Sequence, residues 1–206
     1  SLTKGLQCMG FSADGESMTA PQGKLEADSA SDPLTSLRAS GVRADGEPDC
    51  GDFDMRIDRN GTWFYRGSPI GRKPMVKLFA TVLNKHDDGS YWLTTPVENG
   101  RIEVEDVPYV AVEMVHSGSG SSQKIDFRTN LDAIVALDQD HPLRVATNSE
   151  TGEPTPYVHV EKGLDARLAR AVFYHLVGLG EERVAGDEAS FGVWSRGQFY
   201  RLGASE

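Results

Sequence analysis

Cationic side chains gather in one part of an otherwise acidic chain. Between residues 55 and 77 the sequence holds one acid, Asp58, and six cations, which are Arg56, Arg59, Arg66, Arg72, Lys73 and Lys77. This basic segment has a net charge of +5, whereas the whole chain has a formal net charge of -10 at pH 7. Such a local excess of one sign predicts either an anion site or a set of ion pairs with acids elsewhere in the fold.

An anion site would lie at Gly71, Arg72 and Lys73, where the sequence predicts the start of a helix. Free backbone N–H groups and the positive end of the helix dipole attract phosphate, pyrophosphate or carboxylate groups, and two adjacent cations add to this attraction. The loop is not a P-loop, because only three residues separate Gly67 from Gly71 and Pro74 follows Lys73. ATP hydrolysis of the P-loop type is therefore disfavoured.

The alternative is that the basic segment forms ion pairs within the protein. Acids that could pair with it across a domain contact lie further along the chain, at Glu98, Glu103, Glu105, Asp106 and Glu113. Arginine and lysine on hairpin strands often face solvent or pair in this way. From the sequence alone both interpretations remain open.

Other residues add weaker candidates. Asp52 and Asp54 are two positions apart and would share one face of a strand, where they could hold Mg²⁺ or act as acid and base. Arg128, Thr129 and Asn130 end a predicted strand and could line a cleft. The aromatic residues Tyr65 and Tyr174 fit a core or an interface, although either ring could stack on a base.

Known catalytic motifs are absent from the sequence. It contains no Gly-x-Ser-x-Gly, His-Glu-x-x-His or Cys-x-x-Cys motif, and its five histidines lack metal-ligand spacing. We therefore assign no catalytic residue, no metal and no cofactor.

The elements that would position these residues follow from hydrophobic periodicity. Alternation over residues 53–57, the pair Asn60-Gly61 and the aromatic run 62–65 predict a β-hairpin. Helices are expected over residues 72–85 and 165–177, with a Gly/Ser loop at 117–122 and a closing hairpin at 191–202. Further strands are expected at 91–95, 102–105, 109–115, 124–128, 143–146 and 157–160.

Composition and charge narrow the class of protein. The 206 residues are 38% hydrophobic and 25% charged, which is typical of a globular protein. The negative net charge disfavours binding to bulk nucleic acid or to membrane surfaces, and no apolar run is long enough to cross a membrane. Two isolated cysteines, Cys8 and Cys50, favour reduced thiols and a cytoplasmic protein over a disulfide framework.

The chain divides into three parts by composition. Residues 1–45 predict an extended N-terminal arm with a possible short helix at 24–38. Residues 46–100 and 101–206 predict two small β-rich domains of the α+β class. Both domains contain a helix and an aromatic strand that follows a glycine, at Gly61 and at Gly197, which suggests an internal repeat.

The run from Cys50 to Pro74 resembles the signature of an uncharacterised bacterial family, domain of unknown function 1285. Supporting matches lie at residues 91–97, 107–114, 127–130, 140–143 and 171–174, so the resemblance covers about residues 45 to 202. It implies a two-domain α+β fold with a repeated motif and a C-terminal domain similar to the pleckstrin-homology barrel. It also implies a cleft between the domains for a nucleotide-like ligand, and a role in signalling. It supplies no catalytic residues.

Three hypotheses follow. The first is a ligand-sensing or adaptor module, in which Arg72 and Lys73 bind an anionic ligand, such as a nucleotide-based one, between the domains. Asp54 and Arg56 would orient this ligand, and Arg128 and Asn130 would approach it from the second domain. The second is a protein–protein interaction module without a small ligand, and the third is a Mg²⁺-dependent enzyme that uses Asp52 and Asp54.

Overall fold

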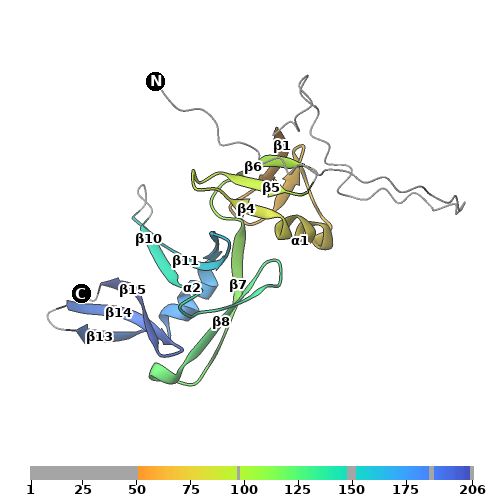
Figure 1. The fold of residues 1–206 in the computed structure, drawn as a ribbon. Coiled ribbons are helices and arrows are strands. Elements are labelled where there is room, and N and C mark those ends of the chain that lie inside the picture. The colour runs from red at the N-terminus through yellow and green to blue at the C-terminus, as the bar shows by residue number, and fades with distance from the viewer. Residues whose placement is uncertain (1–50, 97, 148–151, 186–187, 205–206) are drawn as a thin grey trace, which may run out of the picture.

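The computed structural model describes residues 51–96, 98–147, 152–185 and 188–204. The expected arm at 1–45, the possible helix at 24–38 and both cysteines lie outside these residues. The described chain forms two bodies joined where β6 (Asn99–Val104) leads into the long strand β7 (Tyr109–Ser117), as Figure 1 shows. Each body contains a six-stranded sheet and one α-helix, and the second body adds a three-stranded sheet.

The first sheet has the order β3-β2-β1-β6-β5-β4. Its other strands are β1 (Asp52–Ile57), β2 (Trp63–Tyr65), β3 (Ser68–Pro69), β4 (Leu83–Lys85) and β5 (Tyr91–Thr94). The expected hairpin is confirmed, since β1 and β2 pair antiparallel around a turn in which Gly61 has a φ of 75°. Strand β1 buries Phe53, Met55 and Ile57 and turns the residues between them toward the opposite face.

Helix α1 (Lys73–Thr81) packs against the buried face of this sheet. Val76 and Phe79 are buried, and the Phe79 ring stacks on that of Trp63 with 6.2 Å between the ring centroids. Pro74 stands in the first turn, where no helical hydrogen bond needs its nitrogen. The expected extension of the helix to residue 85 is wrong, because Leu83–Lys85 pairs with β5 as strand β4.

The second body begins at Tyr109. Its large sheet has the order β10-β11-β12-β7-β8-β9, and its small sheet has the order β13-β14-β15. The added strands are β8 (Lys124–Thr129), β9 (Ile134–Ala136), β10 (Leu143–Thr147), β11 (Pro154–Glu161), β12 (Leu164–Leu168), β13 (Glu181–Ala185), β14 (Glu188–Ser195) and β15 (Gln198–Ala204). All five strands expected between residues 97 and 160 are present, as is the closing hairpin.

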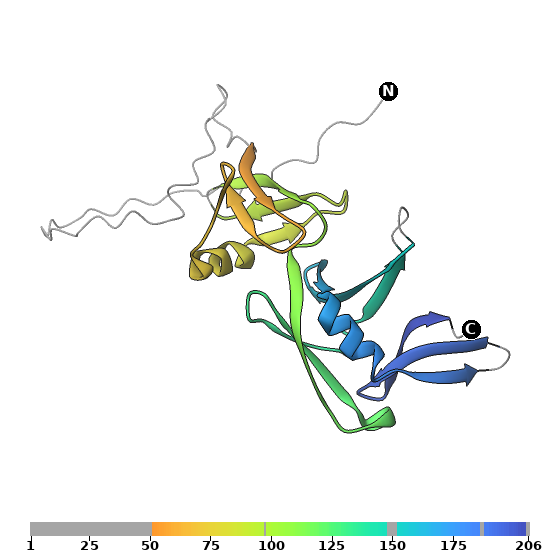
Figure 2. The same ribbon diagram turned by 180° about the vertical axis from the view of Figure 1, so that it is seen from behind.

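Helix α2 (Arg170–Val177) lies between the large and the small sheet of the second body, a position visible from both sides in Figures 1 and 2. Its expected start at residue 165 is wrong, because Leu164–Leu168 forms strand β12, which pairs with β7 and β11. The Gly/Ser loop expected at 117–122 joins β7 to β8 and contains a 3-10 turn at Gly120–Ser122.

The two bodies repeat a motif of a helix followed by three antiparallel strands. After α1 come β4, β5 and β6, which are adjacent in their sheet, and after α2 come β13, β14 and β15 in the same arrangement. The fold is therefore a strand-rich, two-domain duplication whose described residues contain two short α-helices. The boundary expected between residues 100 and 101 would divide β6, which belongs to the first sheet. No helix in the described part of the chain is both long and apolar enough to span a membrane.

Candidate functional site

The basic segment meets the second domain at Asp132, in the turn between β8 and β9. Lys73 and Lys77 are one helical turn apart on α1, and their Nζ atoms lie 2.7 Å from the two carboxylate oxygens of Asp132. Arg128 approaches the same carboxylate at 3.3 Å and also pairs with Glu113 at 2.5 Å. Hydrogen bonds from Lys73 and Lys77 hold the pKa of Asp132 well below its usual range. Lys73 and Lys77 of the first domain therefore join it to Asp132 of the second domain.

Asn130 contributes a second link across the same boundary. Its side-chain amide donates a hydrogen bond to the carbonyl oxygen of Gly61 at 3.1 Å, and its side-chain oxygen accepts one from the backbone N–H of Val110 at 3.1 Å. Thr129 is fully buried, and its hydroxyl oxygen accepts a hydrogen bond from the backbone N–H of Ala133. Both residues position the β8–β9 turn against the first domain.

A third group of contacts surrounds Asp106, in the segment between β6 and β7. Tyr157 donates a hydrogen bond to Asp106 at 2.9 Å, and Arg167 lies 3.1 Å from the other oxygen of this carboxylate. Arg167 also donates to the carbonyl oxygen of Arg59, in the β1–β2 turn, at 2.5 Å. Burial, together with Asp106, raises the pKa of Tyr157 to about 12. We call the contacts of Asp132, Asn130 and Asp106 the interdomain contact.

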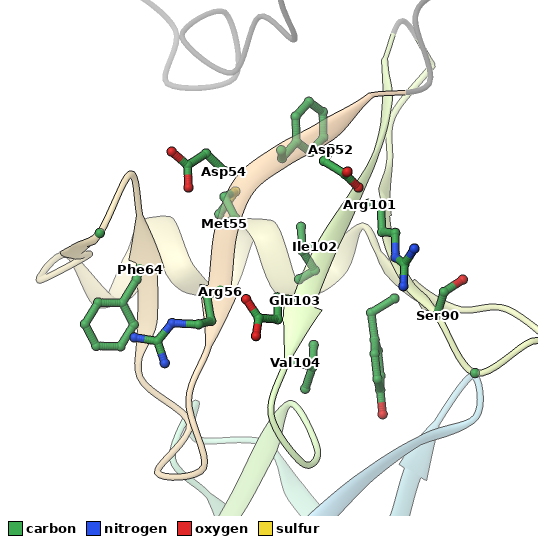
Figure 3. Close-up of a pocket in the computed structure, with 14 residues that line it drawn as sticks. Asp52, Asp54, Met55, Arg56, Phe64, Ser90, Arg101, Ile102, Glu103 and Val104 are labelled. Atoms are coloured by element: carbon green, nitrogen blue, oxygen red, sulfur yellow. The ribbon is translucent and has the colours of Figure 1, made fainter.

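A hollow of about 720 Å³ lies on the face of the first sheet that is turned away from α1. Strands β1 and β6 run side by side along it, and Figure 3 shows their polar side chains on this face. We call it the outer hollow. Its charged and hydroxyl-bearing lining residues are Asp52, Asp54, Arg56, Ser90, Tyr91, Arg101 and Glu103, and Phe64 adds a further aromatic ring.

The charges of the outer hollow are mixed. Three carboxylates and two guanidinium groups give its lining a net charge of -1 at neutral pH. The Arg56 guanidinium pairs with Glu105 and lies over the Phe64 ring, 4.4 Å from its centroid. The backbone N–H of Arg101 donates to the carbonyl oxygen of Gly51, and the charge of its side chain acts on Asp88. The guanidinium itself forms no hydrogen bond or ion pair with another residue that the structure describes. Arg101 is therefore the cation in this lining that is available to a ligand.

Tyr91 connects the outer hollow with the interdomain contact. It lines the hollow and is 8% exposed. Burial raises the pKa of Tyr91, and the negative charges of Asp165 and Asp106 act in the same direction. Asp106 belongs to the interdomain contact, and Asp165 lies on β12 of the second domain, where it pairs with Arg144 at 2.7 Å. The hydroxyl of Tyr91 is therefore within electrostatic reach of both domains.

Comparison with known families agrees with this two-domain architecture. Residues 44–107 match the domain of unknown function DUF1285, N-terminal domain, and residues 108–202 match the protein of unknown function DUF1285, C-terminal domain. The chain belongs to the DUF1285 family. The junction between the two matched regions falls between β6 and β7, where the first sheet ends.

Two solved DUF1285 structures are similar to this chain. The crystal structure of a DUF1285 family protein from Silicibacter pomeroyi DSS-3 is 41% identical, with a TM-score of 0.71, and the match covers 83% of this chain and 94% of that one. A DUF1285 family protein from Shewanella baltica OS155 is 28% identical, with a TM-score of 0.49 over 61% of this chain and 91% of that one. No curated protein matches the chain.

The structure of this DUF1285 protein separates the residues that the sequence suggested for one site. Asp54 and Arg56 line the outer hollow, whereas Lys73, Arg128, Thr129 and Asn130 serve the interdomain contact or its turn. Tyr65 lies opposite Met55 on the α1 side of the sheet, and Arg66 stacks on it at 5.1 Å. Gly71 and Arg72 are exposed in the loop before α1. The structure therefore does not bring Arg72 and Lys73 together with Asp54 and Arg56.

Tyr174 lies in a different hollow. This space has a volume of about 340 Å³ and is formed by the start of β11, the end of β12 and α2. We call it the helix hollow. Tyr174 is 59% exposed there, and its hydroxyl oxygen accepts hydrogen bonds from Arg170.

Sequence reasoning missed Arg101 and Asp132. Arg101 could have been found, because it directly precedes the strand expected at 102–105 and, on a strand that begins earlier, would face the same side as Glu103. For Asp132 the sequence offers only the residue type. Aspartate is one of the few residues that tolerate a left-handed conformation, and Asp132 adopts a φ of 66°. Across the described ranges, no group of three or more histidine, cysteine or acidic side chains could hold a metal ion.

Proposed function

We propose that this DUF1285 protein is a non-enzymatic binding module whose small ligand lies in the outer hollow. The observation that carries the proposal is the position of the Arg101 guanidinium, which forms no described hydrogen bond or ion pair, in a hollow that also presents Asp52 and Glu103. Its volume falls in the range of about 300–1,000 Å³ that is usual for small-molecule sites. Arg101 would bind one anionic group of the ligand, and the carboxylates would accept hydrogen bonds from its hydroxyl or amino groups.

The charge balance narrows the ligand class. A lining with a net charge of -1 repels a polyphosphate, but it accommodates a ligand with one phosphate and several hydrogen-bond donors. Nucleoside monophosphates and cyclic nucleotides have this composition, and the Phe64 ring with Arg56 above it offers a planar surface near β2. This proposal moves the expected anion site away from Arg72 and Lys73 and keeps Asp54 and Arg56 in it.

The proposed role in cytoplasmic signal transduction rests on the link between hollow and interface. Tyr91 lines the hollow, and the charges of Asp106 and Asp165 act on it. In this proposal a ligand that contacts Tyr91 would alter the contact with the second domain. A protein partner that contacts both domains would detect this change. We also infer a pleckstrin-homology-like architecture for the second domain, supported by its six-stranded and three-stranded sheets around the single helix α2.

A protein–protein interaction module without a small ligand is the second candidate. It is favoured by the pairing of Lys73 and Arg128 with Asp132, since these cations are then engaged within the protein rather than by a ligand. In that case the outer hollow would be part of a surface that contacts another protein.

Calorimetric titration and thermal unfolding would test the small-ligand proposal. The probes are AMP, GMP, cyclic AMP, ATP and inorganic phosphate, measured with the wild type and with Arg101→Ala. A ligand at 100 times its Kd should stabilise the wild type by about 2.7 kcal/mol. We expect a monophosphate nucleotide to bind more tightly than ATP, and we expect Arg101→Ala to abolish its binding.

Arg72→Ala is the matched control, because Arg72 is also exposed and also has no described partner but lies outside the outer hollow. It should bind the nucleotide as the wild type does. If no probe binds the wild type, or if Arg101→Ala binds as well as the wild type, the small-ligand proposal is wrong and the second candidate takes its place.

A further inference from the structure

The helix hollow has a composition different from that of the outer hollow. Its walls include Pro154 and Pro156 of β11, Phe173 and Tyr174 of α2, and two cations, Arg167 and Arg170. Glu153 is the one acid among its lining residues, so the lining has a net charge of +1. In a chain with a formal net charge of -10, this places two guanidinium groups beside rigid apolar rings.

The hydrogen bonds of Arg170 identify it as the residue that would meet an anion. Its Nε and Nη2 atoms donate to one neutral acceptor, the Tyr174 hydroxyl oxygen, at 3.2 and 3.1 Å, and the charge of Glu153 also acts on this guanidinium. A guanidinium fork matches the two oxygens of a carboxylate or phosphate, and hydrogen bonds between charged partners are roughly twice as strong as neutral ones. An oxyanion that enters the hollow would therefore replace the phenol oxygen as the preferred acceptor.

Arg167 lies on the opposite wall and is held in place. It donates to the carbonyl oxygen of Arg59 and lies beside Asp106, with its side chain 22% exposed. Its Nε atom is buried and has no well-aligned hydrogen bond. Because the Asp106 carboxylate balances the charge of this fixed guanidinium, Arg170 is the cation of the hollow that can bind an anion.

The apolar walls favour a ligand with a ring. Tyr174 is 59% exposed, an unusual exposure for a large aromatic side chain, and Phe173 beside it is half-buried. Proline rings and tyrosine have few rotatable bonds, so contact with them costs little conformational entropy. A volume of about 340 Å³ suits a compact ligand, at the lower end of the usual range for small-molecule sites.

We propose that the helix hollow binds a small organic anion, a planar ring that carries one carboxylate or phosphate group. The anionic group is bound by the Arg170 fork, and the ring packs against Tyr174 and the two prolines. This site belongs to the second domain, shares no lining residue with the outer hollow and goes beyond the proposed function.

NMR titration of the full chain tests this inference with phenyl phosphate, benzoate, inorganic phosphate and benzyl alcohol. We expect saturable binding of phenyl phosphate or benzoate, with both inorganic phosphate and benzyl alcohol weaker by at least about tenfold. Whichever of the first two binds more tightly shows whether the hollow prefers phosphate or carboxylate. Absence of saturable binding by both, or equal binding of benzyl alcohol, would overturn the proposal.

Variants assign the binding to individual groups. Arg170→Ala should weaken the binding of the anion by at least about tenfold. Tyr174→Phe keeps the ring and removes the competing hydroxyl, so it should bind as well as or better than the wild type. Tyr174→Ala should bind more weakly. Unchanged affinity in Arg170→Ala, or a large loss in Tyr174→Phe, would contradict the assignment.

Two controls make the result independent of the outer hollow and of folding. Arg183→Ala removes another exposed arginine that stacks on aromatic rings, those of Trp194 and Phe199, outside the hollow. Arg101→Ala removes the proposed anchor of the outer hollow. Both should bind phenyl phosphate as the wild type does, and a loss in either one would assign the binding to a place other than the helix hollow. Circular dichroism of each variant confirms that it is folded.

Discussion

The side-chain amide of Asn130 reaches across the domain boundary to the carbonyl oxygen of Gly61. A Cβ atom placed on Gly61 would lie 2.5 Å from Asn130 Nδ2, and Gly61 has a φ of 75°. Only glycine meets both conditions without strain, because other residues avoid positive φ and would displace the amide. The turn of the first hairpin is thus fitted to the β8–β9 turn of the second domain.

Replacing Gly61 should destabilise the protein through both effects. Gly67→Ala is a matched control, since Gly67 has the same φ of 75° but has no atom within 4 Å of an added Cβ. We expect Gly67→Ala to cost about 1–2 kcal/mol from backbone strain alone. Gly61→Ala should cost about 1 kcal/mol more, because Asn130 must move and lose its hydrogen bonds. Urea denaturation measures the difference, and equal costs would contradict the role of Asn130.

Asp132→Asn tests the charged part of the interdomain contact. Asparagine also tolerates a φ of 66°, so the substitution removes charge without adding backbone strain. We expect a lower Tm and a smaller dependence of Tm on salt than in the wild type, because the pairs with Lys73 and Lys77 are exposed and screened. Asp140→Asn, an exposed aspartate whose side chain has no described partner, should leave both properties unchanged.

Acid should weaken the same contact. The pKa of Asp132 is held below its ordinary value of 3.8 by Lys73 and Lys77, so its charged form is favoured in the folded protein. The resulting stability is fully present above the pKa of the unfolded chain and is lost as the pH falls below about 4. Denaturation between pH 7 and pH 3 should show a steeper loss in the wild type than in Asp132→Asn. Parallel pH profiles of the two proteins would contradict this.

Alkaline pH should weaken the contact at Asp106. Burial raises the pKa of Tyr157 and of Tyr109 to about 12, from an ordinary value of 10.0. The stability from their neutral forms is present below pH 10 and is lost as the pH rises toward 12. Phenolate absorbance should therefore have a late phase near pH 12, and Tyr157→Phe should reduce its amplitude. An unchanged late phase in this variant would show that Tyr157 ionises earlier.

The hydrophobic pattern predicted both helices but misplaced one end of each, the C-terminal end of α1 and the N-terminal end of α2. Leu164, Leu168, Val172 and Leu176 recur every four residues, a spacing that fits a helix but also equals two periods of a strand. The segment from Leu164 to Leu168 is a strand whose alternate residues are buried, and only the later pair lies in α2. Pairing with β7, more than 50 residues earlier in the chain, decides the outcome, and no local pattern contains that information.

Charge patterning identified the unusual segment but not its partner. The basic segment was correctly singled out, and Glu105, which pairs with Arg56, was among the acids considered. Asp132 was not, because its proximity to α1 arises from the packing of one domain on the other. Only part of the outer hollow could be predicted from the sequence. Asp54 and Arg56 alternate on one strand, whereas Arg101 lies on the parallel neighbouring strand β6.

The order of elements along the chain has a consequence for biosynthesis. Every strand of the first sheet lies between residues 52 and 104, so that domain can complete its hydrogen bonding while the second is still being synthesised. Until residues 130–132 have emerged and folded, Lys73, Lys77 and the Gly61 carbonyl have only water as their partner. During that interval the nascent first domain therefore carries Lys73 and Lys77 without the countercharge that Asp132 later supplies.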